Sequence, residues 1–246
     1  MGIQLSSRAP RSSIRKRSFI IGALIVALLV GGYLLYNWLV RSPGRMTLIY
    51  RYVRDPQAHA DWAITAGERC GDAPFVMPTD GIIGFVWGDS FGIGHSHQGL
   101  DIFAPTELNQ TPVLVAYDGY LTRNSDWRSA VIIRHPEDPL QRGRQIWSYY
   151  SHMADPEGNS FIAPEFPPGT TEVFVPAGTL LGYQGNYSGD PTSPTGIHLH
   201  FSIVLDDVYG TFKNELDFRN TLDPLPYLGI DLDAINEGEQ FVVCNE

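Results

Sequence analysis

The sequence has little charge, little cysteine and no acidic residue before Asp55. Charged residues make up 18% of its 246 positions, which is too few for a disordered acidic chain, and the 43% apolar fraction is enough to build a core. Only two cysteines are present, and neither has a C-x-x-C or histidine neighbour at zinc-finger spacing. The sequence therefore argues against a cysteine-based metal site.

Charge is divided unevenly along the chain. Residues 1–17 contain five basic residues and no acid, whereas the remainder contains 12 basic and 27 acidic residues, a net charge of −15. An acidic body disfavours nucleic acid, whose phosphates attract Lys and Arg surfaces. We therefore predict no nucleic-acid partner, and we interpret the acidity as a contribution to solubility.

An uncharged apolar run follows the basic cluster. It covers residues 19–40, and a helix of about 20 residues spans a bilayer core of roughly 30 Å. Three aromatic residues lie near its far end, where amphipathic rings favour the membrane interface. The sequence predicts a transmembrane helix at residues 18–40. The positive-inside rule then makes residues 1–17 a cytoplasmic tail and places the rest of the chain outside the cytoplasm, anchored to the cell membrane.

A cleaved signal peptide is the alternative, because it begins with the same kind of basic cluster. Its apolar core usually covers about 7–15 residues and ends at a small-residue cleavage site. Here the run is longer and no A-x-A site follows it, which favours an uncleaved anchor. A mature N-terminus near residue 40 would overturn this prediction.

The two cysteines agree with a location outside the cytoplasm. Cys70 and Cys244 lie near the two ends of the expected soluble domain, and an oxidising compartment permits a disulfide between them. Closing so long a loop would stabilise the fold by on the order of 5 kcal/mol in the chain-entropy model. Two unpaired thiols are the alternative.

After the anchor the composition favours short strands joined by turns, since Gly (25) and Pro (18) are plentiful. Residues 41–70 are expected to form a juxtamembrane segment, in which residues 47–53 fit either a strand or one side of a helix. Residues 71–246 are expected to form the soluble domain. The strands predicted in it are 81–86, 100–103, 112–117, 120–123, 130–134, 145–152, 179–183 and 197–205.

No convincing amphipathic helix follows the anchor, and a parallel α/β sheet would need crossover helices. We therefore predict an all-β domain with a mostly antiparallel sheet.

A histidine and a carboxylate stand four residues apart in His97-Gln98-Gly99-Leu100-Asp101. On a straight strand they would lie roughly 13 Å apart. That is too far to share a zinc ion, whose bonds to N and O are about 2.0–2.2 Å. If both residues are ligands the chain must bend between them, and Gly99 permits a bend.

A second pattern, His198-Leu199-His200, lies in a strand whose apolar and polar residues alternate. Both imidazoles then point the same way, about 7 Å apart. One ring can bind a metal while the other reaches a water molecule or a substrate. The alternative is a polar face that only meets solvent.

A third pattern, Tyr150-Ser151-His152, ends a strand rich in aromatic residues. In this order the three patterns resemble the lysostaphin-like, LytM-type zinc endopeptidases of the M23 family, whose motifs are H-x-G-x-D, then Y-x-H, then H-x-H followed by Phe. Segments 112–119 and 178–185 resemble the same family. The resemblance covers roughly residues 72–205.

The resemblance implies a β-sandwich-like fold of LytM type in which His97, Asp101 and His200 hold one Zn²⁺. A fourth position is left for water or the substrate carbonyl. It also implies that His152 and His198 orient or deprotonate the water and stabilise the oxyanion, and which residue does which stays open. No H-E-x-x-H pattern is present, so the glutamate base of that class of zinc protease is not available.

The implied activity is that of a membrane-anchored metalloendopeptidase acting on peptidoglycan stem peptides or cross-bridges. One alternative is a non-enzymatic regulator of other cell-wall hydrolases, although all five metal and catalytic positions are filled. Another is a peptidase with a protein substrate. A structural zinc would normally have four protein ligands, and the motifs supply three. The oligomeric state does not follow from the sequence.

The remaining histidines have no motif partners. His95 lacks Gly at +2 and Asp at +4, so His97 is the ligand and His95 is expected to be a loop residue near the cleft. His59 and His135 are interpreted as structural or surface residues. The Pro-rich segment 154–171 and the loop 189–194 are expected to border the cleft and to set its specificity.

Overall fold

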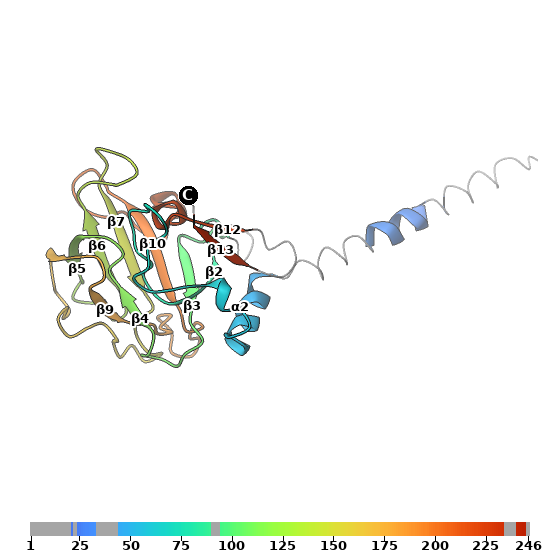
Figure 1. The fold of residues 1–246 in the computed structure, drawn as a ribbon, viewed down its shortest axis with the longest axis horizontal. Coiled ribbons are helices and arrows are strands. Elements are labelled where there is room, and N and C mark those ends of the chain that lie inside the picture. Colours follow the sequence, from blue (N-terminus) through green and yellow to red (C-terminus); the bar gives the residue numbers. More distant parts are fainter. Residues whose placement is uncertain (1–20, 22–23, 33–43, 90–93, 234–239, 245–246) are drawn as a thin grey trace, which may run out of the picture. The chain divides into compact units, whose positions relative to one another are not determined.

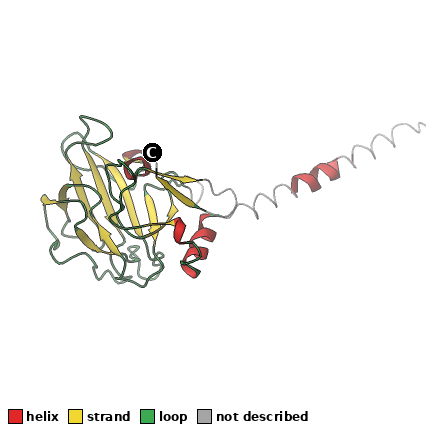
Figure 2. Ribbon diagram, in the orientation of Figure 1, coloured by secondary structure: helices red, strands yellow, loops and turns green. Residues whose placement is uncertain are grey.

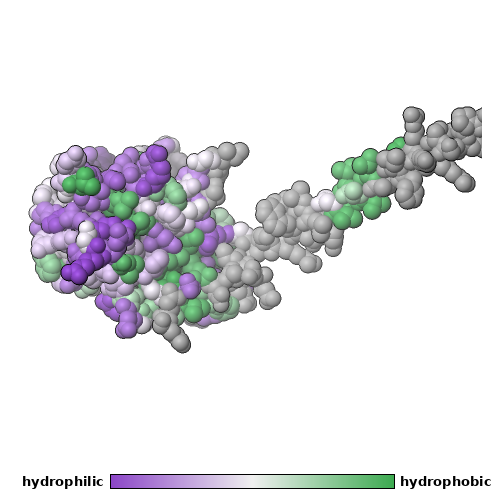
Figure 3. All heavy atoms as spheres, turned by 90° about the horizontal axis from the view of Figure 1, so that it is seen from above, coloured by the Kyte–Doolittle hydropathy of each residue, from purple (hydrophilic) through white to green (hydrophobic). Residues whose placement is uncertain are grey.

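The structure is a computed structural model that describes residues 21, 24–32, 44–89, 94–233 and 240–244. It contains two units, Met1–Pro43 and Gly44–Glu246. In the first unit, residues 24–32 are helical and carry exposed apolar side chains, which are green in Figure 3.

Within the described ranges, no helix has both the length and the apolar character needed to cross a membrane. All of the predicted tail (1–17) and most of the predicted anchor (18–40) lie outside the described residues.

One large antiparallel sheet forms the framework of the second unit (Figure 1). Its strand order is β1-β2-β3-β10-β7-β6-β5-β8, with β11 also paired to β10. All of these pairs are antiparallel. The strands are β1 (Ala63–Ile64), β2 (Gly81–Phe85), β3 (Leu100–Phe103), β5 (Gly119–Thr122), β6 (Val131–His135), β7 (Ile146–Ser151), β8 (Val173–Val175), β10 (Leu199–Leu205) and β11 (Thr221–Leu222).

The other described strands form two antiparallel pairs, β4 (Pro112–Leu114) with β9 (Leu180–Tyr183) and β12 (Ile230–Asp233) with β13 (Phe241–Cys244). Among the described residues of this unit helices are few (Figure 2): α2 (Arg45–Arg54), α3 (Leu225–Leu228) and two 3₁₀ turns, η1 (Ala60–Trp62) and η2 (Phe218–Asn220). The predicted mostly antiparallel β domain is therefore confirmed.

Strand β10 lies between β3 and β7 and is buried along almost its whole length. Its apolar side chains Leu199, Phe201 and Ile203 enter the main core, where Phe201 packs with its ring centroid 5.1 Å from that of Tyr150. Burying a side chain of this size contributes about 1.5–3 kcal/mol. The opposite side of β10 carries His200, which is also buried, so the alternative of a solvent-facing polar side is wrong.

Of residues 41–70, expected as a juxtamembrane segment, the described residues 44–70 fold against the sheet. Residues 47–53 lie within α2, whose Leu48, Ile49 and Tyr52 are buried in a cluster with side chains of β2 and β3. Gly84 of β2 makes room for the helix, because a Cβ there would stand 2.6 Å from Ile49 Cδ1. The helix is thus part of the folded unit.

A disulfide joins Cys70 to Cys244 across 174 residues of sequence. It ties β13 to the segment that precedes β2. The buried side chain of Gln240 donates a hydrogen bond to the Ile83 carbonyl at 3.0 Å. The described C-terminal residues therefore return to the start of the sheet.

Candidate metal centre

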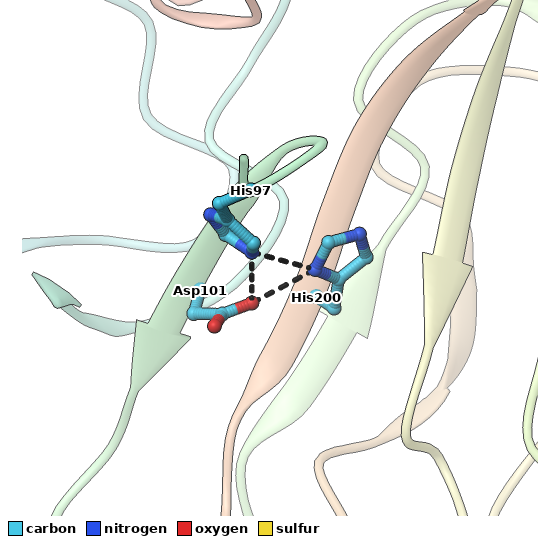
Figure 4. A group of neighbouring side chains, drawn as sticks. All are labelled: His97, Asp101 and His200. Carbon is cyan, nitrogen blue, oxygen red and sulfur yellow. Dashed lines mark hydrogen bonds and ion pairs between the residues drawn. The ribbon is translucent and has the colours of Figure 1, made fainter. Parts of the chain in front are cut away.

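Strand register brings two of the predicted ligands together. His200 of β10 is paired with Asp101 of β3 on one side and with Ser151 of β7 on the other. In Figure 4, His97 and Asp101 point toward His200 across the boundary between these strands. Two residues 99 positions apart in the sequence thus share one site.

His97 reaches the same point because it precedes β3 rather than lying in it. Its backbone N–H donates to the Asp89 carbonyl at 2.7 Å, and its own carbonyl accepts from Gly88 N–H at 2.9 Å. This pairing with a turn after β2 carries the ring back toward Asp101. The four-residue spacing, too wide on a straight strand, therefore becomes a direct contact.

Three potential ligand atoms lie close together in this site. His97 Nε2 is 3.0 Å from Asp101 Oδ1 and 3.1 Å from His200 Nδ1, and the last two atoms are 2.8 Å apart. All three residues are buried. In a tetrahedral zinc site with bonds of about 2.0–2.2 Å, ligand atoms stand about 3.3–3.6 Å apart. An outward movement of a few tenths of an ångström would therefore accommodate such a cation.

Hydrogen bonds fix which nitrogen of each ring carries a proton. A backbone carbonyl can only accept, so the ring nitrogen beside it is an N–H. Nδ1 donates to the Val86 carbonyl in His97 (3.1 Å), to the Tyr187 carbonyl in His152 (2.6 Å) and to the Gly196 carbonyl in His198 (2.7 Å). In His200, Nε2 donates to Glu215 Oε1 at 2.8 Å. In each neutral ring the other nitrogen is left with a lone pair.

In the metal-free protein His200 Nδ1 donates a hydrogen bond to Asp101 Oδ1 at 2.8 Å, and once that proton is lost all three ligand atoms are electron-pair donors directed at one point. Burial by itself lowers the pKa of His200, but hydrogen bonds to Asp101 and Glu215 outweigh it and raise that pKa to about 10. Burial by itself raises the pKa of Asp101, yet His198 and the hydrogen bonds from neighbouring rings hold it well below its usual range. A site that attracts a proton this strongly also suits a divalent cation, which competes with protons for the same atoms.

His152 and His198 lie beside the three ligands. Their ring centroids are 4.5 Å apart, and His198 Nε2 is 3.5 Å from Asp101 Oδ1. Phe103 stacks on His198 at 4.7 Å and limits its movement. Burial, together with the neighbouring His198 and His200 rings, lowers the pKa of His152 to about 3, so this ring is neutral at pH 7.

His152 follows β7 with a φ of 68°, which is uncommon for a residue other than glycine. A residue held in this conformation costs on the order of 1–3 kcal/mol, and such residues cluster at functional sites. The five residues of the ordered motifs thus converge on one point. On these grounds the chain resembles the M23 peptidases.

Comparisons with known proteins give structural likenesses only. No family model matches the sequence, and no curated protein matches it. Similar solved structures include Csd3 of Helicobacter pylori (21% identity, TM-score 0.35), a peptidase M23 from Pseudomonas aeruginosa (20%, 0.37) and the catalytic domain of the M23 protein EnpA of Enterococcus faecalis (20%, 0.35). Nothing about activity follows from likenesses this loose.

The matches cover only part of either chain in most cases. They include 61%, 74% and 61% of the present chain, respectively. They span 35% of the Csd3 chain, 60% of the Pseudomonas chain and 95% of the EnpA domain.

The five motif residues, His97, Asp101, His152, His198 and His200, line a cavity of about 610 Å³. Its wall includes Met46 of α2, Tyr149 of β7, and Ser188 and Gly189 of the loop before β10. Of the loop 189–194, which was predicted to border the cleft, Gly189 lines this wall. The Pro-rich segment 154–171 contributes no residue to this wall, and the prediction for it is wrong. Its Ile162, Ala163 and Phe166 are buried in the core instead.

The other three histidines lie outside the group of five motif residues. His95 lines a second cavity that shares Gln98 and Leu216 with the first, so it lies near the cleft as expected. His135 is fully buried, with Nδ1 at 2.9 Å from the Asp118 carbonyl and Nε2 at 2.8 Å from Ser148 Oγ. His59 stacks on Trp62 at 3.9 Å.

Sequence reasoning missed Glu215. This residue belongs to the segment between β10 and β11, beyond the part of the chain that resembles the family. Burial raises the pKa of its carboxyl, but the hydrogen bond and charge of His200 lower it more, and the net pKa lies below its usual value. No motif marks Glu215, so only the folded structure reveals its contact with a ligand.

Proposed function

We propose that this protein is a membrane-anchored zinc metalloendopeptidase that hydrolyses peptide bonds in peptidoglycan stem peptides or cross-bridges. The observation that carries the proposal is the set of two imidazole nitrogens and one carboxylate oxygen within 3.1 Å of one another. Three protein ligands leave one position open, as in catalytic rather than structural zinc sites.

Bound Zn²⁺ would supply Lewis acidity, which polarises a carbonyl and lowers the pKa of water. The protein contributes the rest. His97, Asp101 and His200 would hold the ion. The Val86 carbonyl and the Glu215 carboxylate would keep the lone pairs of the His97 and His200 rings directed at it. The rings of His152 and His198 offer Nε2 atoms that would accept a proton from water or, once protonated, donate to the oxyanion.

The substrate proposal rests on the family resemblance and on the expected location. The cleft wall combines aromatic residues such as Tyr149 and Tyr187 with small ones such as Gly189 and Gly196, which suits an extended peptide. The Cys70–Cys244 disulfide supports a compartment outside the cytoplasm. A domain anchored there by residues 18–40 would have access to the cell wall.

The test is digestion of purified peptidoglycan by the full-length protein, either stripped of metal by a chelator or reloaded with zinc. We expect soluble fragments only after reloading, and mass spectrometry of the fragments identifies the cleaved bond. An Asp101→Asn variant is the control for contaminating hydrolases. Absence of cleavage with zinc verified in the protein would favour a regulator of other hydrolases. Cleavage of a protein substrate alone would favour the other alternative.

A further inference from the structure

The four histidines of the site differ in what holds them. His97, His152 and His198 each donate to a backbone carbonyl, whereas His200 donates to the carboxylate of Glu215 at 2.8 Å. The Glu215 side chain is only 13% exposed. Among these four histidines, His200 is therefore the one whose ring contacts a carboxylate through each of its two nitrogens, Asp101 through Nδ1 and Glu215 through Nε2.

Glu215 cannot occupy the ligand set itself. Its oxygen faces Nε2 of His200, whereas the atom of that ring directed at Asp101 and His97 is Nδ1. The two nitrogens lie on opposite sides of the imidazole. The carboxylate thus acts through the ring and not on the cation.

The residues around Glu215 hold it in place. Before it in the sequence, Lys213 N–H donates to the carbonyl of Leu205, the last residue of β10, at 3.0 Å. After it, the Leu216 carbonyl accepts from Gln98 Nε2 at 3.1 Å, and Gln98 adjoins the ligand His97. The segment is therefore connected to β10, which carries His200, and to the residues just before β3, which include His97.

A second anchor lies further along the same segment. Phe218 stacks on Trp87 at 4.3 Å, and Trp87 Nε1 donates to Thr221 Oγ1 at 2.9 Å. Trp87 belongs to the turn whose backbone pairs with His97. The position of the carboxylate thus follows from packing on either side of it.

We propose that Glu215 is a positioning residue of the metal centre, which orients His200 and strengthens Nδ1 as a donor to the cation. The proposal rests on the zinc site of the proposed function and adds a residue from outside the family motifs. A carboxylate that accepts the distal N–H of a metal-bound histidine fixes the ring and raises its basicity. Loss of such a partner typically weakens metal affinity about 10–100-fold.

The test is zinc affinity, measured by competition with a chromophoric chelator on full-length protein. We expect Glu215→Ala to bind zinc about 10–100-fold more weakly than the wild type. Glu215→Gln keeps an oxygen that can accept the N–H but has no charge, so its affinity should lie between the two. It also serves as the informative variant if Glu215→Ala does not fold. Glu165→Gln removes an exposed carboxylate and should match the wild type.

A second readout separates positioning from a general loss of stability. Co²⁺ in place of zinc reports ligand geometry through its visible absorption bands, which we expect to change in Glu215→Ala and to be restored in part in Glu215→Gln. Wild-type affinity and spectrum in both Glu215 variants would overturn the proposal and leave the zinc site intact. Absence of zinc binding by the wild type would instead overturn the proposed function.

Discussion

At the scale of single residues, the proposed function assigns some atoms of the site to binding a cation and others to proton transfer. His97, Asp101 and His200 present their donor atoms to one another, while His152 and His198 adjoin them with their Nδ1 atoms already committed to backbone carbonyls. This division predicts two classes of variant.

Replacing a ligand and replacing a neighbouring histidine should have different effects. His200→Ala or Asp101→Asn is expected to abolish both zinc binding and peptide hydrolysis, because two remaining ligands hold zinc poorly. His152→Ala or His198→Ala should retain one zinc per chain and lower kcat about 10²–10⁴-fold, the usual contribution of general acid–base catalysis. Metal analysis of each purified variant, together with its kcat, checks both expectations. Near-normal turnover in His198→Ala would refute its assigned role.

Away from the site, His135 predicts a pH dependence of stability. Burial lowers its pKa to about 4, although hydrogen bonding to the Asp118 carbonyl opposes the shift. The unfolded chain protonates this residue near pH 6.5, before the folded one does. Neutral His135 therefore contributes on the order of 3 kcal/mol to the free energy of unfolding above pH 6.5. This contribution is lost as the pH falls to about 4.

Denaturant unfolding at a series of pH values tests this expectation. The free energy of unfolding of wild type should fall more steeply between pH 6.5 and 4 than that of His135→Asn. His95→Asn, at an exposed position, should follow the wild type. Parallel profiles for wild type and His135→Asn would contradict the assignment.

The residues that sequence patterns could predict are those with a fixed spacing. His198 and His200 share a face because a strand alternates, and the H-x-G-x-D motif marked His97 and Asp101. Glu215 carries no such signal, since its contact with His200 depends on how the segment after β10 folds back. Contacts of that kind arise only from tertiary structure.

At the scale of elements, the site depends on a close approach between β3 and β10. Gly99 was expected to permit a bend, but the structure gives a different reason for a glycine. A Cβ at this position would stand 2.3 Å from the Phe201 carbonyl oxygen. The absence of a side chain lets the two strands pair where Asp101 faces His200.

Gly99→Ala should therefore distort the candidate metal site although it replaces none of the proposed ligands. The added methyl group forces the strands apart, which we expect to lower the free energy of unfolding by about 1–3 kcal/mol or more and to weaken zinc binding. Chemical denaturation and chelator competition measure the two effects. Gly44→Ala, where nothing lies within 4 Å of a Cβ, is the matched control. Unchanged zinc affinity in Gly99→Ala would show that the close approach is not required.

The strands could be predicted where alternation or a buried apolar run was strong. All eight predicted strands appear because turn residues bound each run, the strand 100–103 with its predicted ends and the other seven with shifted ends. β8 was missed because it has three residues, two of them exposed, in a Pro-rich context. β12 and β13 were missed because their place in the fold depends on the disulfide between Cys244 and Cys70, which are far apart in the sequence.

At the scale of the whole folded unit, segments outside the family-like region support the site. Arg45 of α2 forms an ion pair with Asp89 at 2.6 Å, and the Asp89 carbonyl holds the backbone of His97. From the other end of the unit, Glu215 holds His200. The candidate metal site is thus supported from both flanks of the sequence that resembles M23 peptidases, through Asp89 on one side and directly by Glu215 on the other.

The most direct test of this account is the activity of metal-free, full-length protein titrated with zinc against a peptidoglycan-derived peptide. We predict no hydrolysis without metal and a linear rise that ends at one zinc per chain, with the break point absent in Asp101→Asn. Hydrolysis that persists after complete metal removal would contradict the account. So would full occupancy at one zinc per chain with no peptide bond cleaved.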